Sequence, residues 1–482
     1  MKYQTVIGLE VHLQAKTNSK MFCSCSSDYF GKEANINICP VCFGLPGALP
    51  VPNEEAIRKC IKLSLALNCK INNNSKFDRK NYYYPDLPKG YQITQSDIPF
   101  GEDGYVEIEI GDDSRRIRIK RVHMEEDTAK SIHEGEDTLV DYNKSGTPLI
   151  EIVTEPDFQT VEEIAAFAKR LRQIIRYAEV SDAEMQKGQM RFELNMSLKT
   201  PDLAAHELPD YRIEVKNIGS ISVLEKVIDF EYERQSIEID NGKKMISQTR
   251  GLKNMSGETL LQRTKESADD YRYFPEPDIP PIKLDDTWIN EIKESIKELP
   301  LERKTRYLEL GLELEQADIF IEDTDRGDWF DLVCQEEGSN DTKIAKELSK
   351  WINSDIAGFV EKRKTSFEKM PLTTKDFLYL LNLLLENKIT GTVVKKVIEI
   401  IFTTGKAGAE EIIKERNLLQ ITDESELEKF VDKVISDNEK VVKDIKKNPN
   451  AVKFLVGLVM RESRGKANPN TTEELLKEKL DL

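Results

Sequence analysis

The sequence lacks long apolar runs, low-complexity segments and internal repeats. Its 482 residues are 39% hydrophobic and 33% charged. No uninterrupted stretch of about 18 apolar residues occurs, which argues against a membrane-spanning helix. The first residues, MKYQTVIGLEVHLQ, contain no apolar core followed by a small-residue cleavage site. We therefore expect a chain without a secretory signal that is cytoplasmic and has no membrane partner.

The familiar glycine-rich nucleotide motifs are also missing. Neither G-x-x-x-x-G-K-[ST] nor G-x-G-x-x-G occurs, so a nucleotide would have to be held by other groups. Residues 77–92 are dense in aromatic and charged side chains, and we expect them to form an ordered loop that lines a site. The candidate cofactor-binding residues are Arg79, Lys80, Lys89, Arg191 and Glu193.

The net charge of −17 argues against a nucleic-acid partner when the chain is taken as a whole. A basic patch can persist within an acidic chain, however. Residues 441–470 contain seven Lys or Arg residues and only two acidic ones, which leaves five net positive charges. The basic residues of this window are Lys443, Lys446, Lys447, Lys453, Arg461, Arg464 and Lys466.

Alternation of apolar and polar residues predicts strands with one polar face throughout residues 1–292. It occurs in 3–14, 149–155, 191–198 and 212–216, and residues 105–110 and 116–120 flank a turn as in a hairpin. A capping box at Thr160 and Glu163 begins a helix between these strands. Residues 293–408 and 409–482 have helical periodicity. We expect an α+β fold with a largely antiparallel sheet, followed by an all-helical domain and a small helical tail domain.

A histidine and several carboxylates lie on the predicted polar strand faces. Glu10 and His12 are two residues apart on one strand and therefore point the same way. Glu125 lies near the end of a second strand, and Glu151 lies on a third. Such a donor set suits Mg²⁺, which supports phosphoryl-transfer chemistry. We predict that Glu10, His12, Glu125 and Glu151 converge as a catalytic magnesium site; the alternative is a set of surface carboxylates and a structural histidine.

Four of the seven cysteines are clustered in the sequence. Cys23 and Cys25 form a C-x-C pair, and Cys39 and Cys42 form a C-x-x-C pair thirteen residues later. Four thiolates at these spacings can close a tetrahedron around Zn²⁺. We predict a structural zinc knuckle, with four free thiols as the alternative. A closed site of four cysteines leaves no open position for catalysis.

A series of segments, in order along essentially the whole chain, resembles the B subunit of the tRNA-dependent amidotransferase. The most specific segments are IGLEVHLQ (7–14), CPVCFGLPGALPVPN (39–53), FDRKNYYYPDLPKGYQITQ (77–95), HMEEDTAK (123–130), VDYNKSGTPLIEIVTEPD (140–157), EVKNIGS (214–220), DYRYFPEPDIPP (270–281) and GKANPN (465–470).

The resemblance implies the domains and the activity. It implies a cradle-like catalytic domain (1–292), a helical domain (293–408) and a tail domain (409–482) whose basic window binds tRNA. It also implies that ATP phosphorylates the side-chain carboxylate of misacylated Glu-tRNA(Gln) or Asp-tRNA(Asn), after which ammonia displaces phosphate. The chain contains no amidase motif of its own. The ammonia source is then an amidase-fold glutaminase, the A subunit, which the small C subunit joins to this chain.

One stretch departs from the family pattern. The family usually reads close to MEEGSxRCDANVS, whereas residues 185–197 read MQKGQMRFELNMS. Two glutamates are replaced by Gln186 and Lys187, and a Cys-Asp pair is replaced by Phe192 and Glu193. These changes leave two alternatives open. One is a divergent paralogue that activates a different carboxylate, and the other is a tRNA-binding scaffold without catalysis.

Overall fold

The computed structural model describes most of the chain, in two compact units of residues 1–300 and 301–482. The described residues are 2–111, 113–201, 203–204, 207–264, 271–338, 342–406, 408–419, 424–438, 441–442, 452–463 and 466–480. Among them, no helix is both long enough and apolar enough to cross a bilayer.

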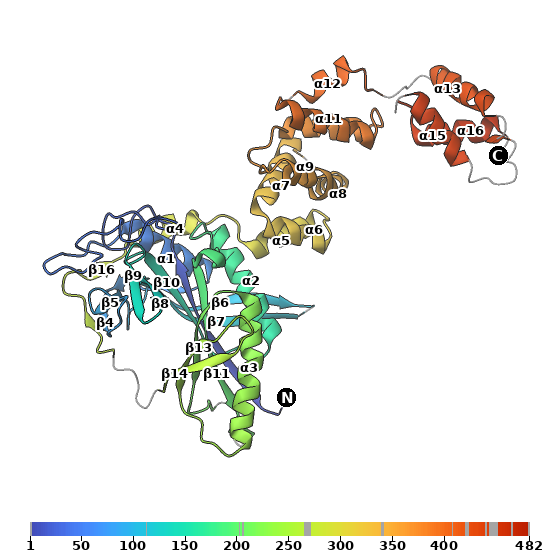
Figure 1. The fold of residues 1–482 in the computed structure, drawn as a ribbon. Helices are drawn as coiled ribbons and strands as arrows, with labels where there is room; N and C mark the ends of the chain where they lie inside the picture. Colours follow the sequence, from blue (N-terminus) through green and yellow to red (C-terminus); the bar gives the residue numbers. More distant parts are fainter. Residues whose placement is uncertain are drawn as a thin grey trace. The chain divides into compact units, whose positions relative to one another are not determined.

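The first unit is built on a nine-stranded sheet, with strand order β14-β13-β12-β11-β1-β10-β7-β6-β2 (Figure 1). Every neighbouring pair is antiparallel except β12 and β13, which confirms the expected α+β fold with a largely antiparallel sheet. The strands are β1 (Gln4–Gln14), β2 (Lys70–Ile71), β6 (Gly101–Ile110), β7 (Asp113–Glu126), β10 (Pro148–Thr154), β11 (Met190–Lys199), β12 (Ile213–Ile218), β13 (Gln248–Leu252) and β14 (Thr259–Thr264).

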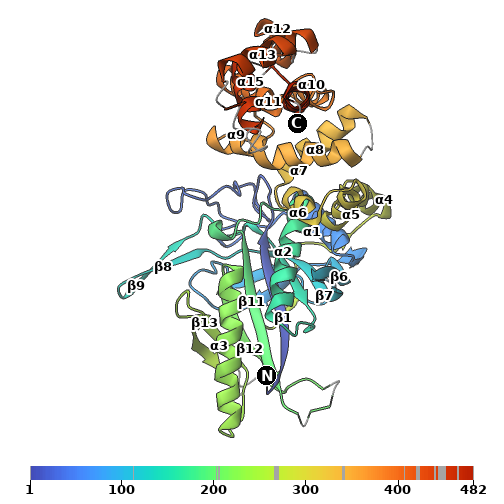
Figure 2. The same cartoon turned by 90° about the vertical axis from the view of Figure 1, so that its right-hand side faces the viewer.

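Helices cover one face of this sheet and leave the other for polar side chains. The helices α1 (Glu54–Ala66), α2 (Val161–Tyr177) and α3 (Ile221–Asp240) pack against strands of the sheet, and Figures 1 and 2 show α2 and α3 on the same side of it. The predicted capping box at Thr160 and Glu163 is present at the start of α2. The apolar residues of β1 and β11 are buried in the core beneath the helices. The polar set of β1, which includes Glu10 and His12, therefore faces away from the core.

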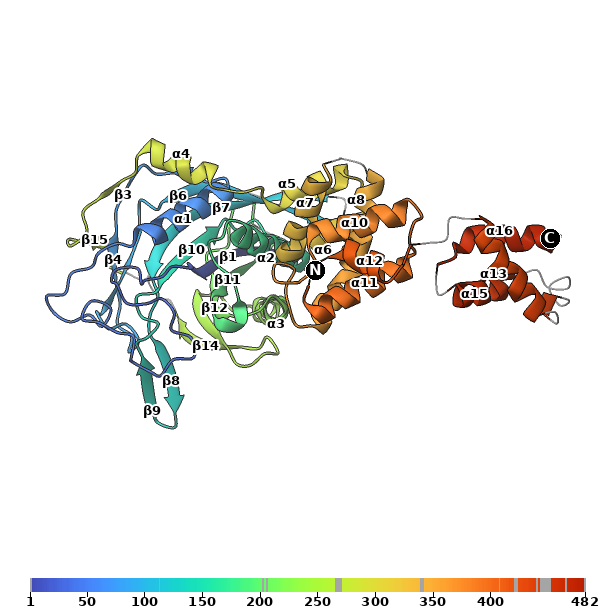
Figure 3. The same cartoon turned by 90° about the horizontal axis from the view of Figure 1, so that it is seen from above.

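Short strands build the rim of the first unit. One small sheet has the order β15-β4-β5, and another pairs β16 with β3. The segment 77–92, expected to be a loop, thus contains β4 and the start of β5. A third small sheet is a hairpin of β8 and β9, which projects from the unit in Figures 2 and 3. The bounds are β3 (Asn74–Ser75), β4 (Asp78–Asn81), β5 (Tyr91–Thr94), β8 (Lys130–Glu134), β9 (Asp137–Asp141), β15 (Phe274–Pro275) and β16 (Ile282–Lys283).

The second unit is helical in the residues described. Helix α12 packs against α10 and α11, whereas α13, α15 and α16 share a separate apolar core. The three-domain division at 292 and 408 stays a prediction. Helix α4 (Asp286–Glu294) and the turn η1 (Met185–Lys187) belong to the first unit; the remaining helices are α5 (Pro300–Glu309), α6 (Leu314–Glu322), α7 (Thr324–Glu337), α8 (Thr342–Trp351), the π-helical turn η2 (Ile352–Ile356), α9 (Ala357–Lys362), α10 (Thr374–Leu385), α11 (Gly391–Thr404), α12 (Ala409–Glu415), α13 (Glu424–Asp437), α15 (Val452–Glu462) and α16 (Pro469–Lys479).

Candidate functional site

The polar face of the large sheet carries a charged pocket of about 590 Å³. The register of the sheet strands determines which side chains form the floor of this pocket. His12 on β1 pairs with Glu151 on β10, and Glu151 pairs in turn with His123 on β7. Side chains directly opposite each other on one face of a sheet lie close together, so this row concentrates titratable groups. The charged side chains that line the pocket are Glu10, Lys80, Lys120, Arg121, Glu125, Glu151, Glu193, Arg212, Glu214 and Lys216.

The four residues predicted to bind magnesium all line this pocket, in two adjoining groups. Ligand atoms of His12, Glu125 and Glu151 lie within 4.8 Å of one another. His12 Nε2 is 3.4 Å from Glu151 Oε2. Glu10 belongs to the second group, in which its carboxylate lies within 4.8 Å of the carboxylates of Glu193 and Glu214. The three members of the first group offer one imidazole nitrogen and carboxylate oxygens, a donor set that fits Mg²⁺.

Buried neighbours fix the charge of these groups. Burial opposes the charged form of Glu125, but Lys80 and His123 outweigh it and lower the pKa of Glu125 to about 2. Burial likewise opposes protonation of His12, yet Glu193 and Glu151 raise its pKa. Burial is the main cause that raises the pKa of Glu10, with Glu151 next. The first group therefore carries ionised carboxylates, as a metal site requires.

Hydrogen bonds hold these carboxylates in place. Thr94 Oγ1 donates to Glu125 at 2.7 Å, and Gln92 Nε2 donates to the same carboxylate at 3.0 Å. In the second group, Asn195 Nδ2 donates to Glu10 at 3.0 Å. Lys216 Nζ lies 2.9 Å from Glu193 and 3.0 Å from Glu214.

Several buried polar atoms near the pocket have no hydrogen-bond partner in the described part of the chain. Buried polar groups are normally paired, so each such atom has bonding capacity left for a ligand, an ion or water. These atoms are His12 Nδ1, Arg121 Nε, His123 Nδ1 and Asn195 Oδ1.

The four clustered cysteines come together as the spacing predicted. The sulfur atoms of Cys23, Cys25, Cys39 and Cys42 all lie within 4.8 Å of one another. The Cys39 and Cys42 sulfurs are 3.8 Å apart, which matches the edge of about 3.8 Å of a tetrahedron with Zn–S bonds of about 2.3 Å. A hydrogen bond from Cys23 lowers the pKa of Cys42 to about 4 against the effect of burial, and nearby Lys20 adds to this shift. The cluster can therefore hold a metal such as zinc.

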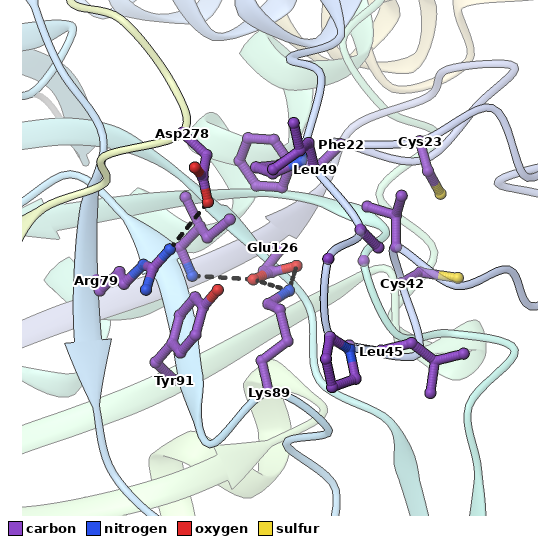
Figure 4. A pocket seen from close by; sticks show the side chains of 18 residues that line it. Phe22, Cys23, Cys42, Leu45, Leu49, Arg79, Lys89, Tyr91, Glu126 and Asp278 are labelled. Atoms are coloured by element: carbon purple, nitrogen blue, oxygen red, sulfur yellow. Dashed lines mark hydrogen bonds and ion pairs between the residues drawn. The ribbon is translucent and has the colours of Figure 1, made fainter.

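Two predicted cofactor residues, Arg79 and Lys89, line a different cavity of about 270 Å³ beside the cysteine loop (Figure 4). Arg79 makes two bonds of 2.7 Å to Glu276, and Lys89 lies 2.6 Å from Glu126. Figure 4 shows Lys89 directed toward Glu126 and Arg79 directed toward Asp278. Arg79 and Glu126 line this cavity, whereas their chain neighbours Lys80 and Glu125 line the charged pocket. The strands that carry them thus form a wall between the two cavities.

The atypical stretch 185–197 contributes to both sides of the sheet. Phe192 is buried in the core, and Glu193 faces the charged pocket. Arg191, also predicted to bind the cofactor, lies 3.5 Å from Asp127 and does not line the charged pocket. Lys187 pairs with Glu184 at 2.9 Å on the turn η1 and lies outside the charged pocket, so its reversed charge does not enter it.

The predicted tRNA-binding residues are only partly described. Lys453 and Arg461 lie exposed on α15, and Lys466 precedes α16. The remaining four, Lys443, Lys446, Lys447 and Arg464, lie outside the described residues. A role in tRNA binding stays a prediction for all seven.

Sequence reasoning missed several residues of the charged pocket. His123 Nε2 lies 3.5 Å from both Glu125 and Glu151, so it bridges two strands of the first group. Lys216 and Glu214 complete the second group. All three belong to segments singled out for their motifs, HMEEDTAK and EVKNIGS; the alternation in 212–216 already predicts that Glu214 and Lys216 share the polar face, but neither was named as a site residue, and strand parity could have placed His123 there too. The same parity places Arg121, two residues before His123, on this face; Lys120 could not be placed this way, because the strand is irregular there.

Comparison with known proteins agrees with this geometry. The model of the GatB/GatE catalytic domain matches residues 5–290, and that of the GatB domain matches residues 328–480. The chain belongs to the family of amidotransferase B subunits. Two similar family members are the B subunits of the aspartyl/glutamyl-tRNA(Asn/Gln) amidotransferases of Caldanaerobacter subterraneus subsp. tengcongensis, 43% identical over 100% of both chains, and of Persephonella marina, 41% identical over 100% of both chains.

A third family member, from Carboxydothermus hydrogenoformans, is 42% identical over 99% of each chain. The matches to these family members thus span both units. They favour the amidotransferase interpretation over a divergent paralogue or a scaffold without catalysis.

Proposed function

We propose that this chain is the carboxylate-activating subunit of a tRNA-dependent amidotransferase. Its substrates are Glu-tRNA(Gln), Asp-tRNA(Asn) or both. A side-chain carboxylate oxygen attacks the terminal phosphorus of ATP, which gives an acyl phosphate and ADP. Ammonia then attacks the acyl carbon, phosphate leaves, and the amide forms with loss of a proton. The observation that carries the proposal is the group of His12, Glu125 and Glu151 in a charged pocket, within a catalytic-domain match.

The residues of the charged pocket have distinct tasks in this reaction. His12, Glu125 and Glu151 would hold Mg²⁺, and Glu10 would add a carboxylate beside them. The ion supplies positive charge against the charge that develops on the transferred phosphoryl group. Lys80 keeps Glu125 ionised, and Lys216 offsets part of the negative charge of Glu193 and Glu214. The acyl phosphate must be kept from water, which its formation in a pocket rather than on an open surface favours.

The wider assembly follows from the same proposal. A glutaminase of amidase fold, the A subunit, supplies ammonia, because ammonia is scarce at neutral pH, and the small C subunit joins the two. The basic window of the tail contacts tRNA phosphates. The four cysteines hold a structural Zn²⁺, and the complex acts in the cytoplasm, where its tRNA substrates are made.

The test uses the complete complex with the A and C subunits, misacylated tRNA, glutamine, ATP and Mg²⁺. Glu125→Gln keeps the shape of the side chain but removes the charge that holds the ion. We expect amidation to fall about a hundredfold or more, with tRNA affinity nearly unchanged. Hydroxylamine should trap an acyl hydroxamate with the wild-type complex and not with the variant.

Glu107→Gln is the matched control, because Glu107 lies on the β6–β7 hairpin, where it pairs with Arg116. It should retain wild-type amidation. Wild-type activity in Glu125→Gln would show that the first group, which contains Glu125, takes no part in the reaction. Amidation by the wild-type complex without ATP would refute the activation step itself.

A further inference from the structure

Arg121 differs from Lys80 and Lys216, two lysines of the charged pocket that have carboxylate partners. Lys80 lies 3.7 Å from Glu125, and Lys216 contacts two carboxylates. Arg121 also lines the pocket, yet no carboxylate among the described residues lies within ion-pair distance of its guanidinium, and its buried Nε has no hydrogen-bond partner there. An unpaired buried donor is costly, so one that lies beside a pocket stands available to a ligand that enters it.

Regular alternation with His123 places Arg121 on the pocket face of β7, and an irregularity beside it adds a second basic side chain. Arg121 pairs with Val153 on β10, whereas Ile119 pairs with the next residue, Thr154, so Lys120 is an extra residue in β7. Consecutive residues of a regular strand face opposite sides, yet Lys120 and Arg121 both line the pocket while Ile119 stays buried in the core. Bulges beside active sites re-aim side chains in this way.

Arg121 lies where it can contact an anion that binds beside the first and second groups of the charged pocket. It lies two residues before His123 on β7, which is about 6.5 Å along the strand. Across the sheet it shares a row with Glu10, since both pair with Val153. Five glutamates repel an anion, and the two lysines within ion-pair distance of them already counter part of that charge. Because no carboxylate is paired with this guanidinium, its positive charge is available to a phosphate. Its planar set of N–H donors also matches the geometry of phosphate oxygens.

We propose that Arg121 binds the terminal phosphate of the nucleotide and stays with the phosphoryl group as it is transferred. This inference rests on the ATP-dependent reaction proposed above. The bond from the phosphorus to the ADP oxygen breaks, and the bond to the substrate carboxylate oxygen forms. Arg121 keeps its protons throughout and donates hydrogen bonds to the non-bridging oxygens. The charged pocket thereby gains a phosphate-binding group in the absence of a glycine-rich loop.

The test measures equilibrium binding of two probes, AMPPNP with Mg²⁺ and AMP, to the assembled complex. AMP lacks the terminal phosphate and reports on the rest of the nucleotide site. Arg121→Ala should weaken AMPPNP binding about ten- to a hundredfold and leave AMP binding within about twofold. Arg121→Lys, which keeps the charge but not the fork, should fall between wild type and Arg121→Ala. In steady-state amidation, Arg121→Lys should raise KM for ATP and lower kcat, with KM for tRNA unchanged.

The matched control is Arg116→Ala on the same strand, where Arg116 is exposed and pairs with Glu107. It should bind both probes like the wild type. Wild-type AMPPNP binding in Arg121→Ala, or an equal loss of both probes in a folded Arg121→Lys, would overturn the inference while leaving the proposed function intact. If the wild-type complex bound neither probe, ATP itself would be removed from the reaction, and the role of Arg121 with it.

Discussion

Lys20 is a fully buried lysine whose ammonium group faces a cysteine sulfur. Its Nζ lies 3.5 Å from Cys42 Sγ and donates to the Asn37 carbonyl at 2.9 Å. No carboxylate in the described part of the chain lies within ion-pair distance of it. A buried ammonium needs a negative partner, and a metal bound by four thiolates supplies one, since Zn²⁺ with four thiolates carries two net negative charges.

We predict that Lys20→Met weakens zinc binding about tenfold or more, because the neighbouring cation no longer offsets the negative charge on the sulfurs. Competition with a chromophoric chelator measures this affinity, and cobalt substitution reports whether the tetrahedral geometry persists. Lys16→Met is the control, since Lys16 is exposed and pairs with Asp182. A Lys20→Met protein that binds zinc as tightly as the wild type would show that Lys20 serves packing alone.

At the scale of elements, the wall between the two cavities depends on one ion pair. Arg79 on β4 binds both oxygens of Glu276, the residue after β15, and Glu276 is 2% exposed. Arg79 also lies 4.3 Å from the centre of the Tyr91 ring on β5. The arginine therefore joins all three strands of the small sheet, although the sequence suggested it as a cofactor ligand.

We predict that Arg79→Met lowers the free energy of unfolding of the first unit by about 3–5 kcal/mol, because it leaves the Glu276 carboxylate buried and unpaired. Thermal denaturation measures the loss, and hydrogen exchange should rise at the amides of 274–276. Lys283→Met on the exposed strand β16 should change neither. Unchanged stability of Arg79→Met together with weaker nucleotide binding would show that Arg79 binds the cofactor and does not stabilise the small sheet.

The elements that the sequence predicted are those whose signals are local. The alternation in 3–14 places Glu10 and His12 on one face, and the capping box at Thr160 marks the start of α2. The strands β4 and β5 escaped prediction because they are short and are paired with each other and with β15, almost 200 residues away. The bulge at Lys120 depends on pairing with β10, so alternation within β7 alone could reveal Arg121 but not that Lys120 also lines the pocket.

At the scale of the whole molecule, acidic and basic residues are distributed unevenly along the chain. The chain carries a net charge of −17, yet basic residues gather in the tail. The described helices α13, α15 and α16 enclose their own apolar core. Lys453 and Arg461 are exposed on α15, and the structure describes no carboxylate within ion-pair distance of either. The charged pocket lies entirely in the first unit, so substitutions in the tail should change tRNA affinity without altering the chemistry.

We predict that the double variant Lys453→Gln and Arg461→Gln in the full complex weakens tRNA binding and lowers the slope of log affinity against log salt by about 0.7–0.9 for each phosphate interaction that is removed. The value of kcat at saturating tRNA should stay at the wild-type level, because the charged pocket is intact. Lys477→Gln on α16 is the control, since Lys477 pairs with Glu473 at 2.6 Å and leaves little free charge for phosphate. An unchanged salt slope in the double variant would place tRNA binding elsewhere on the complex, and a fall in kcat at saturation would show that the tail acts on catalysis as well.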